Sequence, residues 1–257
     1  MCNSITLILV LGGILKNKKM KKYVVFLFVI LLSCTTKQNK KDTQLAKQEK
    51  TIQTSNDTVN NDTEIIETFT DSLSIGEKGK SKIQIIKYRV FDSKYVLVKF
   101  YTKGSNYWEI QNTYMYECEA LEGLEPEIRD FNNDSFNDIT FISLTAARGA
   151  NEVRRLFVYD KENKSLTSIL NSEEYPNIRY NKELDCIDAF LVYGGTTTVF
   201  ARIQKDSLKD FAKVSNEDNY RTVYEINKTG KVKVIRKDRI NEDGIFTRYI
   251  NYKPLHE

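Results

Sequence analysis

The chain has 257 residues, a formal net charge of +4 and a single histidine, His256, next to the C-terminus. Catalytic triads and most catalytic zinc sites need a positioned imidazole, so this composition argues against the common histidine-dependent enzymes. No P-loop, G-x-G-x-x-G or G-x-S-x-G motif occurs either, which removes the usual nucleotide-binding and serine-hydrolase signatures.

The N-terminus carries two apolar runs, Ile5–Leu15 and Tyr23–Leu32. Each is shorter than the roughly 20 residues that a helix needs to cross a bilayer. The second run follows a short basic start at Met20 and ends at Ser33-Cys34, which is typical of a secretory signal. Because this signal is complete without the first 19 residues, we predict that Met20 is the true start.

The four residues "LLSC", from Leu31 to Cys34, resemble the bacterial lipobox. The resemblance implies cleavage before Cys34 and lipidation of that cysteine, although Leu32 stands where a small residue is more usual. An uncleaved signal anchor with an incidental cysteine is the alternative. Each buried CH₂ of an attached lipid contributes about 0.8 kcal/mol, so several chains anchor firmly. We therefore expect a signal peptide over residues 1–33 and an exported protein, lipid-anchored to the outer membrane on its periplasmic or surface face.

The basic charge belongs to the signal. Residues 1–33 contain five lysines and no acid, so the net charge of +4 becomes −1 for the mature chain. A nearly neutral chain does not attract phosphate backbones as a whole, and we expect no nucleic-acid partner. Residues 34–64 have no aromatic side chain and few apolar ones, which predicts a disordered tether after the lipidated cysteine.

Residues 65–257 change to short segments rich in Val, Ile, Tyr, Phe and Thr. In one of them Val96, Val98 and Phe100 fall on one face and Lys99 on the other, the alternation of a β-strand. Ten or so such segments are separated by turn signals at 92–93, 160–164, 194–195, 227–230 and 241–244. We predict one all-β domain, an antiparallel meander that is propeller-like or barrel-like. The segment "SLKDFA", from Ser207 to Ala212, is the best candidate for a short helix.

Two further features have two interpretations each. Cys118 and Cys186 lie in predicted strands of an exported domain, so they form either a disulfide or two buried thiols that never meet. Tyr101, Tyr107 and Trp108 form either a ligand site or part of the strand packing.

The segment "DFNNDSFND", from 130 to 138, is the strongest chemical signal. Asp130, Asn132, Asp134 and Asp138 occupy the first, third, fifth and ninth positions of a calcium-loop pattern, and Phe136 would offer its backbone carbonyl at the seventh. Alternate side chains of a tight loop converge, and Ca²⁺ prefers hard oxygen ligands. A metal-free turn rich in Asn and Asp is the alternative.

Two departures separate this loop from an EF-hand. Ser135 replaces the glycine, and Phe141 replaces the glutamate at position twelve. The loop and the apolar strand after it instead resemble the calcium loop of FG-GAP and VCBS-type β repeats. Residues 125–237 as a whole look similar to periplasmic single-repeat proteins, a group that includes immunity proteins and resembles lysozyme inhibitors. In that family the calcium ion is mainly structural.

The resemblance implies a non-enzymatic, membrane-tethered β domain, stabilised by Ca²⁺, that binds a protein or a glycan. It favours inhibition of a lysozyme-like cell-wall hydrolase as that binding activity. Two other classes stay open: a carboxylate-based hydrolase of cell-wall glycan, and a purely structural envelope lipoprotein.

Overall fold

The computed structural model describes residues 63–120 and 123–256 of the chain. The predicted signal peptide, the predicted lipidation site Cys34 and the predicted tether up to residue 62 lie outside the described residues. Within them the structure is nearly all β, as the alternating segments predict. The first strand, β1 (Thr63–Asp71), begins two residues before the domain boundary that the sequence indicates. In this described part, no helix has the length and apolar character needed to cross a membrane.

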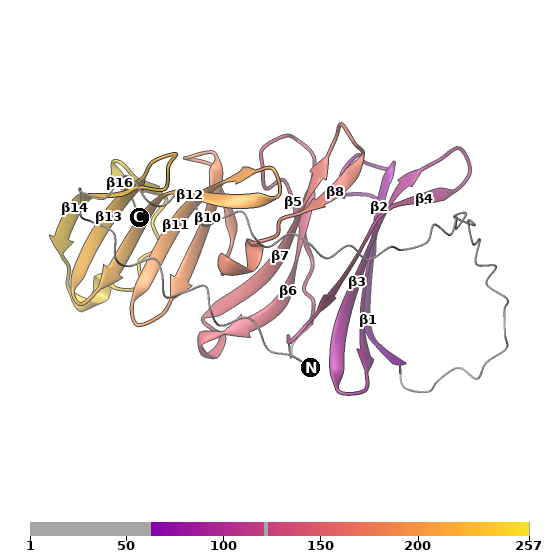
Figure 1. The fold of residues 1–257 in the computed structure, drawn as a ribbon, viewed down its shortest axis with the longest axis horizontal. Helices are drawn as coiled ribbons and strands as arrows, with labels where there is room; N and C mark the ends of the chain where they lie inside the picture. Colours follow the sequence, from indigo (N-terminus) through magenta and orange to yellow (C-terminus); the bar gives the residue numbers. More distant parts are fainter. Residues whose placement is uncertain (1–62, 121–122, 257) are drawn as a thin grey trace, which may run out of the picture. The chain divides into compact units, whose positions relative to one another are not determined.

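The first sheet contains four antiparallel strands in sequence order (Figure 1). Its strands are β1, β2 (Ser81–Val90), β3 (Ser93–Lys103) and β4 (Trp108–Glu117). Val96, Val98 and Phe100 of β3 are all fully buried, which confirms the predicted alternation.

The second sheet repeats this four-stranded antiparallel meander. Its strands are β5 (Glu127–Arg129), β6 (Asp138–Ala146), β7 (Asn151–Asp160) and β8 (Ser165–Ser168). A single turn of 3-10 helix, η1 (Ala147–Gly149), joins β6 to β7, and η2 (Ser172–Glu174) follows β8. Strands β6 and β7 are buried over most of their length because side chains pack on both of their faces.

The third sheet contains six antiparallel strands in the order β14-β13-β12-β11-β10-β9. They are β9 (Arg179–Asn181), β10 (Cys186–Val192), β11 (Thr196–Gln204), β12 (Ser207–Glu217), β13 (Tyr220–Ile226) and β14 (Val232–Arg239). The chain ends in 3-10 turn η3 (Glu242–Gly244) and a small hairpin of β15 (Asn251–Tyr252) and β16 (Leu255–His256).

Two local predictions are wrong in this third sheet. "SLKDFA" is not a helix but the start of β12, which pairs with β11 on one side and β13 on the other. Residues 207–210 pair with β11, and Ala212 is the first residue that also pairs with β13. A six-residue helix has too few internal hydrogen bonds to compete with this strand pairing. The hairpin turn predicted at 241–244 is the 3-10 turn η3, but it does not join two paired strands. Residues 245–250, which follow it, form no strand.

Three buried clusters connect these sheets. The first joins the first and second sheets, with Ile83 and Phe100 against Phe141 and Phe157. The second joins the second and third sheets and includes Leu156 and Val199, whereas the third packs Tyr249 of the C-terminal segment onto Phe200 and Val223. Each sheet is an open antiparallel meander, and the two four-stranded sheets have the up-and-down order of propeller blades. The meander is therefore confirmed, and none of the described sheets closes into a barrel.

Candidate functional site

The predicted loop connects β5 to β6 at their paired ends, where Arg129 lies opposite Asp138. Asn137 ties the loop to the segment after β1. Its backbone carbonyl accepts a hydrogen bond from the N–H of Gly76 at 2.8 Å, and its side-chain amide donates to the carbonyl of Ser74 at 2.9 Å. The first sheet thus holds the loop in place through two polar contacts.

Asp130 organises the first half of the loop. Its Oδ1 accepts the backbone N–H groups of Asn132 and Asp134, both at 3.2 Å, and its Oδ2 accepts the N–H of Ser135 at 2.8 Å. Ser135 has a φ of 72°, in the left-handed region. This is the conformation for which the calcium pattern uses glycine, and the serine adopts it in spite of its Cβ.

Asp134 and Asn132 contact each other across the loop. The Asn132 side-chain amide donates to Asp134 Oδ2 at 2.9 Å, and Asn132 Oδ1 accepts the N–H of Asp134 at 3.3 Å. Asp134 Oδ1 also accepts the N–H of Phe136 at 2.9 Å. The Phe136 ring packs on Tyr159, with ring centroids 5.4 Å apart. The loop brings together four of the five predicted ligand residues by direct hydrogen bonds or packing, and Asp138 completes the set.

Asp138 is the buried carboxyl group of the loop, with 0% of its surface exposed. Its Oδ2 accepts the backbone N–H of Phe131 and its Oδ1 that of Tyr159 in β7, both at 2.8 Å. Burial raises the pKa of Asp138 to about 8, the two N–H donors lower it, and the negative charges of Asp134 and Asp130 raise it further. The charges of Asp134 and Asp130 thus add to the effect of burial and disfavour the ionised form of Asp138.

The carboxylate and amide groups of the loop accept and donate hydrogen bonds within it, as the alternative of a metal-free turn rich in Asn and Asp requires. Within the described residues, no group of three or more His, Cys, Asp and Glu side chains is arranged to hold a metal ion. The donor set still fits Ca²⁺ in its chemistry, because carboxylate and amide oxygens have a second lone pair beside the one that accepts an N–H. Calcium binding thus stays a prediction, with the same five residues as ligands.

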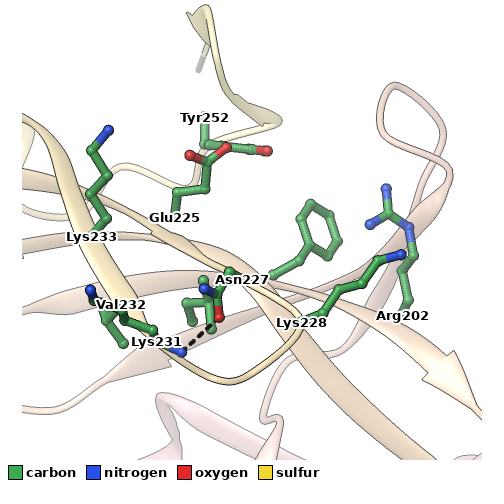
Figure 2. Close-up of a pocket in the computed structure, with 10 residues that line it drawn as sticks. Arg202, Glu225, Asn227, Lys228, Lys231, Val232, Lys233 and Tyr252 are labelled. Carbon is green, nitrogen blue, oxygen red and sulfur yellow. Dashed lines mark hydrogen bonds between the residues drawn. The ribbon is translucent and has the colours of Figure 1, made fainter.

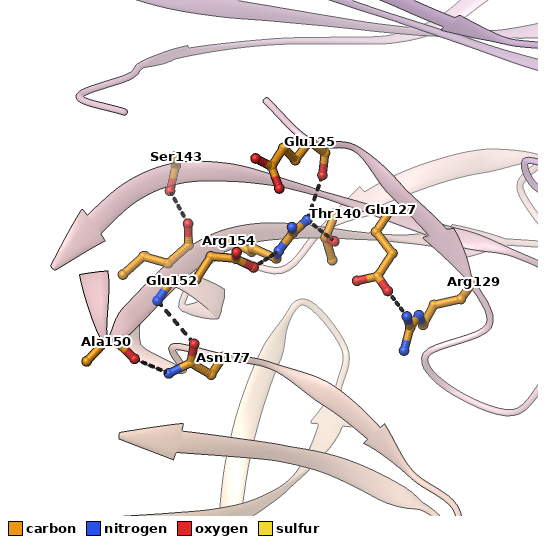
Figure 3. A network of polar contacts seen from close by, with 10 residues as sticks. Glu125, Glu127, Arg129, Thr140, Ser143, Ala150, Glu152, Arg154 and Asn177 are labelled. Atoms are coloured by element: carbon orange, nitrogen blue, oxygen red, sulfur yellow. Dashed lines mark hydrogen bonds and ion pairs between the residues drawn. The ribbon is translucent and has the colours of Figure 1, made fainter. Parts of the chain in front are cut away.

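A buried arginine supports the chain just before the loop (Figure 3). Arg154 Nη1 donates to the carbonyl of Glu125 at 2.8 Å and to Thr140 Oγ1 at 3.2 Å, and its Nε donates to Glu152 at 2.5 Å. Glu127 pairs with Arg129 in the same region. Arg154 of β7 thus connects the segment just before β5 with Thr140 of β6, and this network positions the three strands relative to one another.

The two open alternatives have structural outcomes. Cys118 and Cys186 are free thiols in this structure, buried in different core clusters. Tyr101 and Trp108 both face the Lys82 ammonium, whose Nζ lies 4.1 Å and 5.1 Å from their ring centroids, whereas Tyr107 is 63% exposed.

Sequence reasoning missed a pocket in the third sheet (Figure 2). Its volume is about 690 Å³, and it lies between the β13–β14 hairpin and the C-terminal hairpin. The cations that line it are Arg202, Lys228, Lys231 and Lys233, and its lining also includes Phe211, Glu225 and Tyr252. These residues are spread over 50 positions of the sequence, so no local motif marks them. The feature of the sequence that indicates such a pocket is the excess of Lys and Arg over Asp and Glu after position 220.

Fold and loop together define an all-β protein with one acidic loop of calcium-binding composition. No protein-family model matches the chain, and no curated protein matches it. Among solved structures, one described as a Xanthomonas type IV secretion system related protein is similar over 66% of this chain and 93% of that chain, with a TM-score of 0.43 and 8% identity. At that score and identity, the likeness carries no argument about the activity of this chain.

Proposed function

We propose that the chain is an envelope lipoprotein whose β domain is a non-enzymatic binding module stabilised by one Ca²⁺. The observation that carries this proposal is the charge of the loop. Burial and the nearby charges of Asp134 and Asp130 disfavour the ionised form of Asp138, and none of the three carboxyl groups forms an ion pair with a described Lys or Arg side chain. A divalent cation is the simplest source of the missing positive charge.

The ligands would be the side-chain oxygens of Asp130, Asn132, Asp134 and Asp138 and the backbone carbonyl of Phe136. When bound, the ion would supply positive charge to these oxygens. The chain's own contribution is positional, because Asp138 also holds the N–H groups of Phe131 and Tyr159. Calcium binding would therefore stabilise the junction between the loop, β6 and β7.

The proposed activity of the module is to bind a protein or glycan of the cell envelope, with inhibition of a lysozyme-like hydrolase as the favoured form. The support is the resemblance to periplasmic immunity and inhibitor proteins. The full-length protein, purified in detergent, would be added to a panel of lysozyme-like enzymes during peptidoglycan lysis. Dose-dependent inhibition supports the proposal, and an unchanged rate with every enzyme removes this partner class.

The same assay separates a binding module from an enzyme. Without any added hydrolase, the protein should release no reducing sugar from peptidoglycan. Release of sugar by the protein alone would contradict the non-enzymatic assignment and favour a carboxylate-based glycan hydrolase.

The calcium part of the proposal has its own test. The melting temperature of the full-length protein should fall when a chelator removes calcium and rise again when calcium is restored in excess. The Asp134→Ala variant should melt at the same temperature in both conditions. An unchanged melting temperature in the unaltered protein would contradict stabilisation of the domain by calcium.

A further inference from the structure

The basic residues of the third sheet are gathered at its C-terminal end. Residues 220–257 contain nine Lys and Arg and five Asp and Glu, a net charge of +4, whereas residues 34–219 carry a net charge of −5. The near-neutral mature chain therefore consists of an acidic part and a basic part. Several of these basic side chains line pockets of the described chain, and the pocket described above combines three of them with Arg202.

Four cations line the pocket of about 690 Å³, namely Arg202, Lys228, Lys231 and Lys233. None of the four forms an ion pair with an acidic side chain in the described part of the chain. Glu225 is the only acidic residue that lines the pocket, and its carboxylate lies 3.9 Å from the ammonium of Lys253. The pocket thus has an excess of positive charge that the described chain does not neutralise.

Local structure holds these cations around the pocket (Figure 2). Asn227 Oδ1 accepts the N–H groups of Thr229 and Lys231, both at 2.9 Å, which fixes the turn between β13 and β14. Lys228 extends from this turn toward the side of the pocket that Arg202 lines (Figure 2). Lys233 lies opposite Glu225 in the strand register. The hairpin therefore presents its lysines from a defined backbone.

Aromatic rings form the apolar part of the pocket. The Arg202 guanidinium lies 4.0 Å from the centroid of the Phe211 ring, and the Phe211 and Tyr252 rings meet edge to face at 5.9 Å. Both rings are partly buried by the core cluster beneath them. An apolar floor with a few convergent polar groups, at a volume of several hundred Å³, is the usual form of a small-molecule site.

Lysines on an edge strand also prevent unwanted strand pairing, and β14 is the edge strand of this sheet. That role would account for Lys233. It does not account for Arg202, which lies on β11 inside the sheet, or for Lys228, which lies in the turn. The convergence of side chains from three places favours a ligand.

We propose that this pocket binds a phosphorylated sugar. A phosphate monoester carries about −1.5 to −2 charges and three acceptor oxygens, which match several unpaired cations better than a carboxylate does. Phe211 and Tyr252 lie where the sugar ring would pack, and Glu225 is placed to accept a hydrogen bond from a hydroxyl group. The choice of a sugar rests on the proposed function in the envelope; the choice of phosphate rests on the pocket alone.

The test is a calorimetric titration of the full-length protein with N-acetylglucosamine 1-phosphate, next to inorganic phosphate and unphosphorylated N-acetylglucosamine. We expect the phosphorylated sugar to bind tightest. The triple variant Lys228→Gln, Lys231→Gln, Lys233→Gln should bind it about tenfold more weakly or worse. The control variant Lys78→Gln, Lys103→Gln, Lys164→Gln removes the same charge from exposed positions in the first two sheets and should bind as the unaltered protein does.

Equal affinity of the triple variant and its control would overturn the proposal, as would equal binding of the sugar with and without phosphate. Binding of inorganic phosphate as tightly as the phosphorylated sugar would contradict the claim that the pocket recognises the sugar part of the ligand. Vesicles that display the same phosphorylated sugar on a lipid distinguish a membrane headgroup from a soluble unit, and lysine-dependent binding in either form supports the pocket.

The melting temperature with and without calcium is measured on every variant. A triple variant that keeps its calcium response is folded, so a failure of the pocket and a failure of the calcium proposal give different results.

Discussion

Asp138 Oδ1 accepts the backbone N–H of Tyr159 at 2.8 Å, which joins the last residue of the acidic loop to β7, 21 residues further along the chain. The other oxygen of the same carboxyl group accepts the N–H of Phe131 inside the loop. One buried side chain thus connects the loop with the second sheet. Its burial and its two backbone partners make it the structural centre of the loop, and a bound cation would favour its ionised form.

Removing this carboxyl group should destabilise the domain even without calcium. The Asp138→Ala variant leaves two buried N–H groups without acceptors, and we expect a loss of about 2–4 kcal/mol in the free energy of unfolding. Urea denaturation in the presence of a chelator measures this loss without any contribution from the ion. Asp92→Ala, an exposed position in the β2–β3 turn, should stay within about 0.5 kcal/mol. Equal stability of the two variants would show that Asp138 does not hold the loop.

The ion pair of Asp188 and Arg248 attaches the C-terminal segment to β10. Arg248 Nε donates to Asp188 Oδ1 at 2.8 Å, and the side chains are 17% and 7% exposed, respectively. Asp188→Asn leaves the Arg248 charge unpaired, so we expect a loss of about 2–3 kcal/mol, less than for a fully buried pair. Asp238→Asn removes a more exposed carboxylate that Arg221 and Arg236 share, and it should cost about 0–1 kcal/mol because both arginines keep an amide oxygen as partner. Thermal or urea unfolding measures both, and a smaller loss for Asp188→Asn than for Asp238→Asn would contradict this ranking.

The strands could be predicted from the sequence because their information is local. In β2 and β3, side chains alternate between core and surface, and many of the turns between strands contain Gly, Asn or Asp. The start of β12 could not be predicted, since Leu208 is buried beside its β11 partner and Ala212 lies between β11 and β13. Neighbours distant in the sequence made that segment a strand.

The two candidate sites show the same division. The acidic loop is contiguous, so the spacing of its oxygens was visible, but the burial of Asp138 by β7 was not. The pocket brings Arg202 together with Tyr252, and only the sheet register and the C-terminal hairpin create that contact. The composition indicates a basic C-terminal region, whereas the pocket itself can be recognised only once the fold is known.

The two buried thiols should react slowly with alkylating agents. Burial raises the pKa of Cys186 to about 12, with the charge of Asp188 as a further cause, so almost no thiolate exists at neutral pH. Peptide mass spectrometry after a short iodoacetamide pulse should find Cys118 and Cys186 unmodified in the native protein and modified in urea. A disulfide-linked peptide of the two cysteines, or their fast modification in the native state, would contradict the structure.

The most direct test of the central claim is a calcium titration of the full-length protein by isothermal calorimetry. We predict one Ca²⁺ bound per chain, and affinities about tenfold or more weaker in Asp130→Ala and Asp134→Ala. Asp160→Ala is the matched control, because Asp160 caps the β7–β8 turn through Asn163 in a similar way outside the loop. It should bind calcium as the unaltered protein does. No calcium binding, or equal binding in all three variants, would contradict the account.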